Sequence, residues 1–184
     1  MKTSNLIFDV SDHNRSEYER FCDRLQVIDF HAITHTLQQH FSWTKQQINQ
    51  GIERYQQLLF LLSQYPNQPI IPDQIADEVL HAHLETGDQF TQNCRHILGF
   101  ELTHEAGFET ECEGDRHHQL SLFMQTQALI EKHFGASKQT FSNSPNTKQL
   151  IEFERPAYCV LRIHIPANCI LSRLAKYLSV AALS

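Results

Sequence analysis

The chain has little that would place it in a membrane. None of its apolar runs reaches the roughly 18–20 residues that a membrane-spanning helix needs. The most apolar C-terminal stretch, LSRLAKYLSVAAL, is shorter than that and carries Arg173 and Lys176. The first residues also lack the charged-then-apolar pattern of a secretory signal. We therefore predict no membrane partner.

Paired cysteines are lacking as well. The five cysteines are scattered, their number is odd, and the sequence has no Cys-x-x-Cys pair. A small secreted protein held together by disulfides would show a different pattern. Since there is no secretory signal either, the sequence predicts a reduced, cytoplasmic setting.

Positive charge is in deficit, and several catalytic signatures are missing. Lys and Arg number 15 against 21 Asp and Glu, so the formal net charge is −6. This balance argues against a nucleic-acid partner, which favours a basic face. The sequence has no phosphate-binding loop and no Gly-x-Gly-x-x-Gly fingerprint. It has no His-Glu-x-x-His zinc motif, because His104-Glu105 lacks the second histidine.

What the chain does have is apolar residues at the spacing of amphipathic helices. Its 184 residues are enough for one domain with a sizeable core, and 41% hydrophobic residues fit a globular protein. Spacings of three and four predict helices over residues 17–40, 43–65, 74–84, 87–98, 117–134 and 170–182. The stretch 158–165 is β-prone and lies between Pro156 and Pro166. The predicted fold class is mainly α, a compact helical bundle with a small β element near the C-terminus.

Capping residues mark where these helices begin. We predict that Ser42 caps the helix over 43–65 and that Asp73 caps the next one. Thr86 and Gln89 have the spacing of a capping box, which predicts that Thr86 caps the helix that follows it.

Side chains that can bind metal gather in residues 73–108, where His81, His83, Cys94 and His104 occur. On an ideal helix, positions two residues apart differ by about 200° in direction. A regular helix therefore cannot direct both His81 and His83 at one metal ion, unless it ends or tightens there. Imidazole nitrogens suit zinc and iron among other transition metals.

Two carboxylates precede His81 at spacings that a helix would bring close to its imidazole. Asp77 and Glu78 precede His81 by four and three residues, so a helix would bring either one near its imidazole. We predict a transition metal ion, iron or zinc, on a helical hairpin. The predicted metal ligands are His81, His83, His104 and Glu78, with Asp77 as the alternative carboxylate.

Other interpretations of the same residues stay open. Glu78 and His81, like Glu101 and His104, have the i, i+3 spacing of di-iron bundles, which need further glutamates from two other helices. The histidines could instead bond backbone carbonyls and hold the helix junction together. Cys94 is either a buried inert thiol or a nucleophile activated by a histidine.

The segment VLHAHLETGDQFTQNCRHILGFELTHEAGF, residues 79–108, resembles a motif of the glycine-rich domain-containing protein-like family. The resemblance runs from about Trp43 to Gly135. It is carried by matching positions at His81, His83, Cys94, Gly99 and His104, with Phe90 where the family has tyrosine. The sequence departs from the family at Leu80, which replaces a tryptophan, and at Leu98, which replaces an aromatic residue. Of the family's Phe-Pro-Tyr-Phe run, Phe108 alone remains. The resemblance implies a site rather than a particular reaction.

The resemblance also suggests how the chain is divided into segments. We predict one helical domain over residues 1–184, with a family-like core at about 43–135, a connector at 136–149 and a β/α tail at 150–184. The connector is rich in Ser, Asn, Thr and Lys.

Two functions follow from these patterns. The first is a metal-binding protein. If it is catalytic, it is a metal-dependent enzyme that acts on a small molecule or a peptide. The second is a non-catalytic binding or adaptor module with a protein partner, in which the histidines are structural. In that case the β-prone tail 156–166 would add an edge strand to the partner.

Overall fold

The computed structural model describes residues 10–106, 113–135, 156–157 and 159–164. These residues form helices α1 (Val10–Arg24), η1 (Leu25–Val27), α2 (Phe30–Phe41), α3 (Lys45–Gln64), α4 (Gln74–Leu84), α5 (Asp88–Leu98) and α6 (Glu113–Phe134), and strands β1 (Glu101–Ala106) and β2 (Cys159–His164). The mainly α fold with a small antiparallel sheet is thereby confirmed. The helix expected over 170–182 lies outside the described residues. None of the described helices combines the length and the hydropathy that crossing a bilayer requires.

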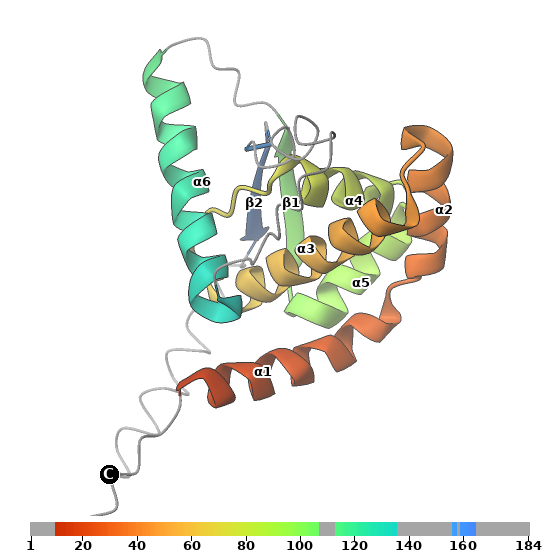
Figure 1. The fold of residues 1–184 in the computed structure, drawn as a ribbon, viewed down its shortest axis with the longest axis horizontal. Coiled ribbons are helices and arrows are strands. Elements are labelled where there is room, and N and C mark those ends of the chain that lie inside the picture. The colour runs from red at the N-terminus through yellow and green to blue at the C-terminus, as the bar shows by residue number, and fades with distance from the viewer. Residues whose placement is uncertain (1–9, 107–112, 136–155, 158, 165–184) are drawn as a thin grey trace, which may run out of the picture.

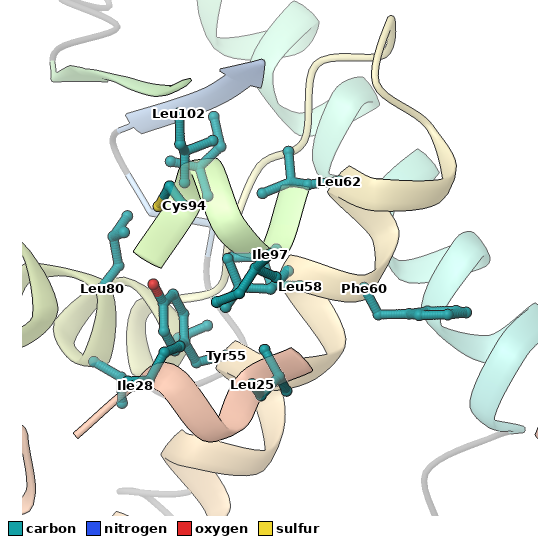
Figure 2. Packing of buried hydrophobic residues seen from close by; sticks show 14 of the residues in the cluster. Leu25, Ile28, Tyr55, Leu58, Phe60, Leu62, Leu80, Cys94, Ile97 and Leu102 are labelled. Carbon is teal, nitrogen blue, oxygen red and sulfur yellow. The ribbon is translucent and has the colours of Figure 1, made fainter. Parts of the chain in front are cut away.

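Helix α3 runs through the middle of the bundle, and most of its second half is buried. The buried residues include Tyr55, Leu58, Leu59, Phe60, Leu61 and Leu62. Figure 2 shows side chains of α3 meeting those of α4, α5 and β1, with Leu80, Ile97 and Leu102 among them. Burying this apolar surface is the main source of the fold's stability.

The start of α3 differs from the prediction. The N-cap is Thr44, which accepts a hydrogen bond from the Gln47 amide at 3.3 Å, while the Gln47 side chain accepts one from the Thr44 amide at 2.9 Å. Ser42 instead ends α2 in the left-handed conformation, with φ 52°. A full capping box at Thr44 satisfies two amides that would otherwise lack partners, so the helix begins later than the pattern predicted.

The turn between α4 and α5 also corrects the prediction. The N-cap of α5 is Gly87 at φ 61°, with no side-chain cap. The Thr86 hydroxyl does not cap α5 but donates to the carbonyl of His83 at 2.7 Å. A positive φ is accessible to glycine without steric cost, and this allows the chain to turn sharply between the two helices.

The two strands bring distant parts of the chain together. β1 pairs with β2 in antiparallel register, so that His104 lies opposite Leu161 and Ala106 lies opposite Cys159. In Figure 1 the strands lie between α6 and the group formed by α3, α4 and α5. His104 therefore lies on a strand, and not on the second arm of a helical hairpin as predicted from the sequence.

At Gly51, helix α3 packs tightly against side chains of α4. A Cβ atom at this position would lie 2.8 Å from Cζ3 of Trp43 and 2.9 Å from Cγ2 of Val79.

Alanine gains about 1 kcal/mol of helix propensity over glycine, but overpacking a core costs about 1–3 kcal/mol. Because two Cβ contacts are shorter than 3.0 Å, the overpacking cost should lie at about 2–3 kcal/mol, so we expect Gly51→Ala to lower the free energy of unfolding by about 1–2 kcal/mol, measured by urea denaturation. The exposed neighbour Gln50→Ala should leave the midpoint unchanged or slightly raised, and an equally stable Gly51→Ala would contradict this account of the packing.

Candidate metal centre

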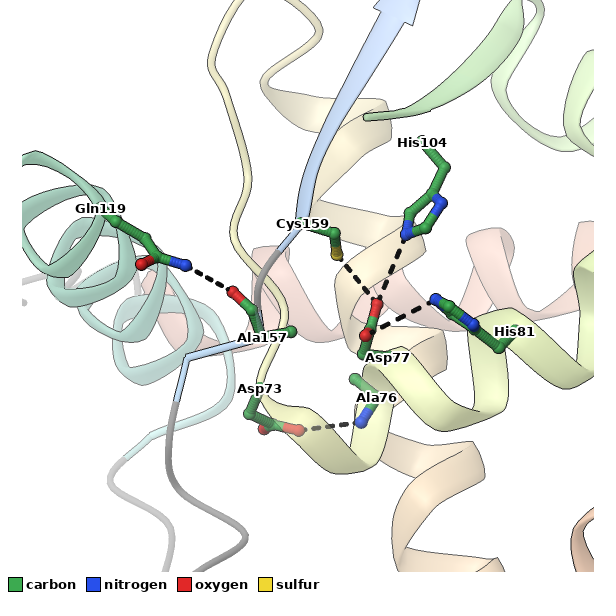
Figure 3. Close-up of polar contacts among 8 residues, drawn as sticks. All are labelled: Asp73, Ala76, Asp77, His81, His104, Gln119, Ala157 and Cys159. Carbon is green, nitrogen blue, oxygen red and sulfur yellow. Dashed lines mark hydrogen bonds and ion pairs between the residues drawn. The ribbon is translucent and has the colours of Figure 1, made fainter. Parts of the chain in front are cut away.

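Three side chains from α4 and β1 converge beside the sheet. Asp77, His81 and His104 each offer one ligand atom, and these atoms all lie within 4.8 Å of one another. The Nε2 atom of His81 lies 3.7 Å from Oδ2 of Asp77, and the Nε2 atom of His104 lies 3.7 Å from Oδ1. Figure 3 shows both imidazoles pointing toward the Asp77 carboxylate. The described part of the chain thus contains a group that could hold a metal ion.

Helix α4 supplies two members of the group. Asp77 and His81 are four residues apart, which places them on one face of the helix. The start of the helix is fixed by Asp73, whose carboxylate accepts from the Ala76 amide at 2.9 Å and lies 2.5 Å from the Arg54 guanidinium. Asp73 is buried and paired with Arg54, so it fixes the first turn of α4, which contains Asp77.

The sheet supplies the third member. Directly opposed residues of an antiparallel pair point to the same face, and so do residues two apart on one strand. The register pairs Ala106 with Cys159, so His104 and Cys159 share the face that meets α4. Figure 3 shows both side chains reaching the Asp77 carboxylate from the strands.

His104 carries the clearest sign of a ligand. Its Nε2 atom is buried and lies 3.7 Å from Oδ1 of Asp77, which is too far for a hydrogen bond, so it has no hydrogen-bond partner among the described residues. A buried polar atom without a partner costs about 1–3 kcal/mol, so such atoms are rare without a reason. Burial lowers the pKa of His104, although the nearby Asp77 charge opposes this shift. The neutral imidazole that results is the form that binds a metal.

Cys159 completes the surroundings of Asp77. Its thiol donates a hydrogen bond to Oδ1 of Asp77, with the sulfur 2.8 Å from the oxygen. Burial raises the pKa of this thiol, and the Asp77 charge and the hydrogen bond raise it further. The thiol therefore stays protonated and acts as a donor to the carboxylate.

The group is closed on one side and open on the other. The side chain of His104 is 12% exposed and that of Asp77 is 20% exposed, whereas that of His81 is 50% exposed. The two imidazole rings meet edge to face, with centroids 4.9 Å apart. Solvent thus reaches the group past His81, while the sheet covers the side of His104.

His83 is not part of this group. Its Nδ1 atom lies 2.8 Å from the Tyr55 hydroxyl, and its Nε2 atom lies 3.1 Å from the Asn93 side-chain nitrogen. The side chain is buried, and burial lowers its pKa to about 4. As the helix geometry required, His81 and His83 point in different directions, and His83 lies inside the core.

The other predicted residues are not among the three side chains whose ligand atoms converge. Glu78 is partly buried, which raises its pKa, and the Asp77 charge raises it further. Of the two carboxylates named from the sequence, the structure brings Asp77 to the imidazoles. Glu101 and His104 are three apart on a strand and so face opposite sides, which removes the helical basis of a di-iron pattern. Cys94 is buried, and burial raises its pKa to about 12, as expected of an inert thiol.

Sequence reasoning did not find Cys159. Cys159 follows Asp77 by 82 positions in the sequence, and its place near Asp77 depends on the pairing of β1 with β2. The alternation in ELTHEA, where Leu102 and His104 share one face, was the available signal for β1. Once β1 is known to pair with the β-prone tail, Cys159 becomes a candidate neighbour of His104.

The chemistry of the group follows from its donor set. Two ligands about 2.0–2.2 Å from a tetrahedral ion lie roughly 3.3–3.6 Å apart. The distance from Oδ2 of Asp77 to Nε2 of His81 and the distance from Oδ1 to Nε2 of His104 are both 3.7 Å, close to that range. Two histidines and one carboxylate form a ligand set used for catalytic zinc and for non-haem Fe(II), and both uses leave positions open.

Comparisons with protein-family models, with curated proteins and with solved structures return no match for this chain. The resemblance to the glycine-rich domain-containing protein-like family therefore stays a prediction.

Proposed function

We propose that this protein binds one divalent transition metal ion, zinc or Fe(II), through Asp77, His81 and His104. The observation that carries the proposal is the buried Nε2 atom of His104, which faces the Asp77 carboxylate without a hydrogen-bond partner among the described residues. An ion between the imidazoles and the carboxylate would satisfy this nitrogen. It would also bring the pair of histidines and the carboxylate into one coordination shell.

The exposed side of the group supports a site that exchanges ligands with solvent. Structural zinc sites use four protein ligands, whereas catalytic sites use three and keep a position open. Here three side chains converge, and the half-exposed His81 borders the solvent. A metal ion bound there would lower the pKa of a bound water or polarise a substrate oxygen. A small molecule or a peptide would approach from the His81 side.

The proposal is tested by metal analysis and thermal unfolding of the purified full chain. We expect about one equivalent of zinc or iron in protein purified without chelators. After removal of metal with a chelator, added ion at 100 times its Kd should stabilise the fold by about 2.7 kcal/mol. For a chain of this size, that corresponds to a rise in Tm of roughly 5–10 °C.

The control is His96→Ala, which removes an exposed histidine on α5 outside the group. This variant should keep the metal content and the rise in Tm. A wild-type protein without bound ion, whose Tm does not respond to Zn(II) or Fe(II), would rule the proposal out.

A further inference from the structure

The two oxygens of Asp77 have different surroundings. Oδ2 faces His81 at 3.7 Å, whereas Oδ1 faces His104 at 3.7 Å and also accepts the hydrogen bond from Cys159 at 2.8 Å. Cys159 is only 2% exposed, so water does not compete well for this hydrogen bond. Rotation of the carboxylate is therefore restricted by a donor that comes from the sheet and not from α4.

We propose that Cys159 is a positioning residue of the metal site, whose thiol holds the Asp77 carboxylate in the orientation in which Oδ1 faces His104 and Oδ2 faces His81. The inference rests on the metal binding proposed above. Hydrogen-bond partners of ligating carboxylates orient the ligand, and their removal typically costs about 10–100-fold in metal affinity. Because the thiol holds Oδ1, each carboxylate oxygen keeps facing one imidazole, as binding of one ion by all three side chains requires.

Two observations favour Cys159 as a hydrogen-bond donor to Asp77 over Cys159 as a fourth metal ligand. The sulfur does not belong to the group whose ligand atoms lie within 4.8 Å of one another. Figure 3 shows Cys159 on the other side of Asp77 from His81.

Three substitutions separate the hydrogen bond from simple packing. Cys159→Ser keeps a donor, Cys159→Ala removes it together with volume, and Cys159→Val removes it while filling the space. We expect the zinc Kd of the serine variant to stay within about threefold of wild type, while alanine and valine weaken binding about 10–100-fold. Affinities are measured by competition with a chelating dye. The far-ultraviolet circular dichroism of the metal-free variants establishes that each one folds.

Cys94→Ala is the matched control, because it removes another buried thiol that lies outside the metal group. Its zinc affinity should equal that of wild type. Cobalt(II) binding provides a spectroscopic readout that packing cannot change. We expect visible ligand-field bands but no sulfur-to-cobalt charge-transfer band in the ultraviolet, in wild type and in the serine variant alike.

The outcomes are distinguishable. If wild type binds no zinc or cobalt, the proposed function fails and this inference fails with it. If wild type binds but the serine, alanine and valine variants all match it, metal binding stands and the positioning role is overturned. A charge-transfer band that disappears in Cys159→Ser would also overturn it, by showing that the sulfur is a ligand.

Discussion

Asp77→Asn is expected to weaken zinc binding by at least about 100-fold, which is about 2.8 kcal/mol at 1.4 kcal/mol per tenfold. Asp77 is the one carboxylate in the group, and the two imidazoles bind as neutral ligands. Asparagine has nearly the same shape and can still accept the hydrogen bond from Cys159. The substitution therefore removes the negative charge from the ligand set while changing little else. The measurement is a competition titration of the metal-free variant with Zn(II).

The stability of the metal-free Asp77→Asn variant should change little. Asp77 lies in the first turn of α4, where a negative charge contributes about 1 kcal/mol or less through the helix dipole. A matched control is Asp88→Asn, which neutralises an exposed aspartate in the first turn of α5. The control should bind zinc as wild type does. An Asp77→Asn protein with wild-type affinity would show that the carboxylate is not a ligand.

His83→Ala is expected to produce the opposite pattern, a large loss of stability with metal affinity unchanged. The substitution leaves the Tyr55 hydroxyl and the Asn93 amide without their buried partner. Each buried group left unsatisfied costs about 1–3 kcal/mol, and the missing ring leaves a cavity in the core. We expect the free energy of unfolding to fall by about 3–4 kcal/mol, measured by urea denaturation of metal-free protein.

A double-mutant cycle tests the cause of that loss. Tyr55→Phe alone should destabilise the fold because His83 loses its hydroxyl partner. In the His83→Ala background the same change should cost less, since the partner is already gone. If His83→Ala lost zinc affinity while keeping its stability, His83 would be a ligand, as predicted from the sequence, and the structural role described here would be wrong.

The helices were largely predictable because their signals are local. The Asp73 cap and the apolar spacing after it gave α4 its observed bounds of Gln74–Leu84. The same helix geometry implied that His81 and His83 could not serve one ion together, and the structure places them on different sides of α4. Caps were less predictable. Ser42 and Thr86 are good capping residues by type, but Thr44 and Gly87 occupy those positions.

The site itself depended on contacts that local patterns do not contain. Asp77 and His81 share a helix turn, so their proximity could be predicted from spacing alone. The proximity of His104 depends on β1 turning back beside α4, and that of Cys159 depends on β2 pairing with β1 in one register. A shift of one residue in that register would move Cys159 to the opposite face of the sheet, away from Asp77.

The central claim, that Asp77, His81 and His104 bind one metal ion together, is tested most directly by anomalous X-ray scattering from crystals of the zinc-loaded protein. The account predicts one strong anomalous peak, about 2.0–2.2 Å from an Asp77 oxygen and from an imidazole nitrogen of each histidine. A peak bound by other residues, or no peak beside Asp77 at saturating zinc, would contradict it.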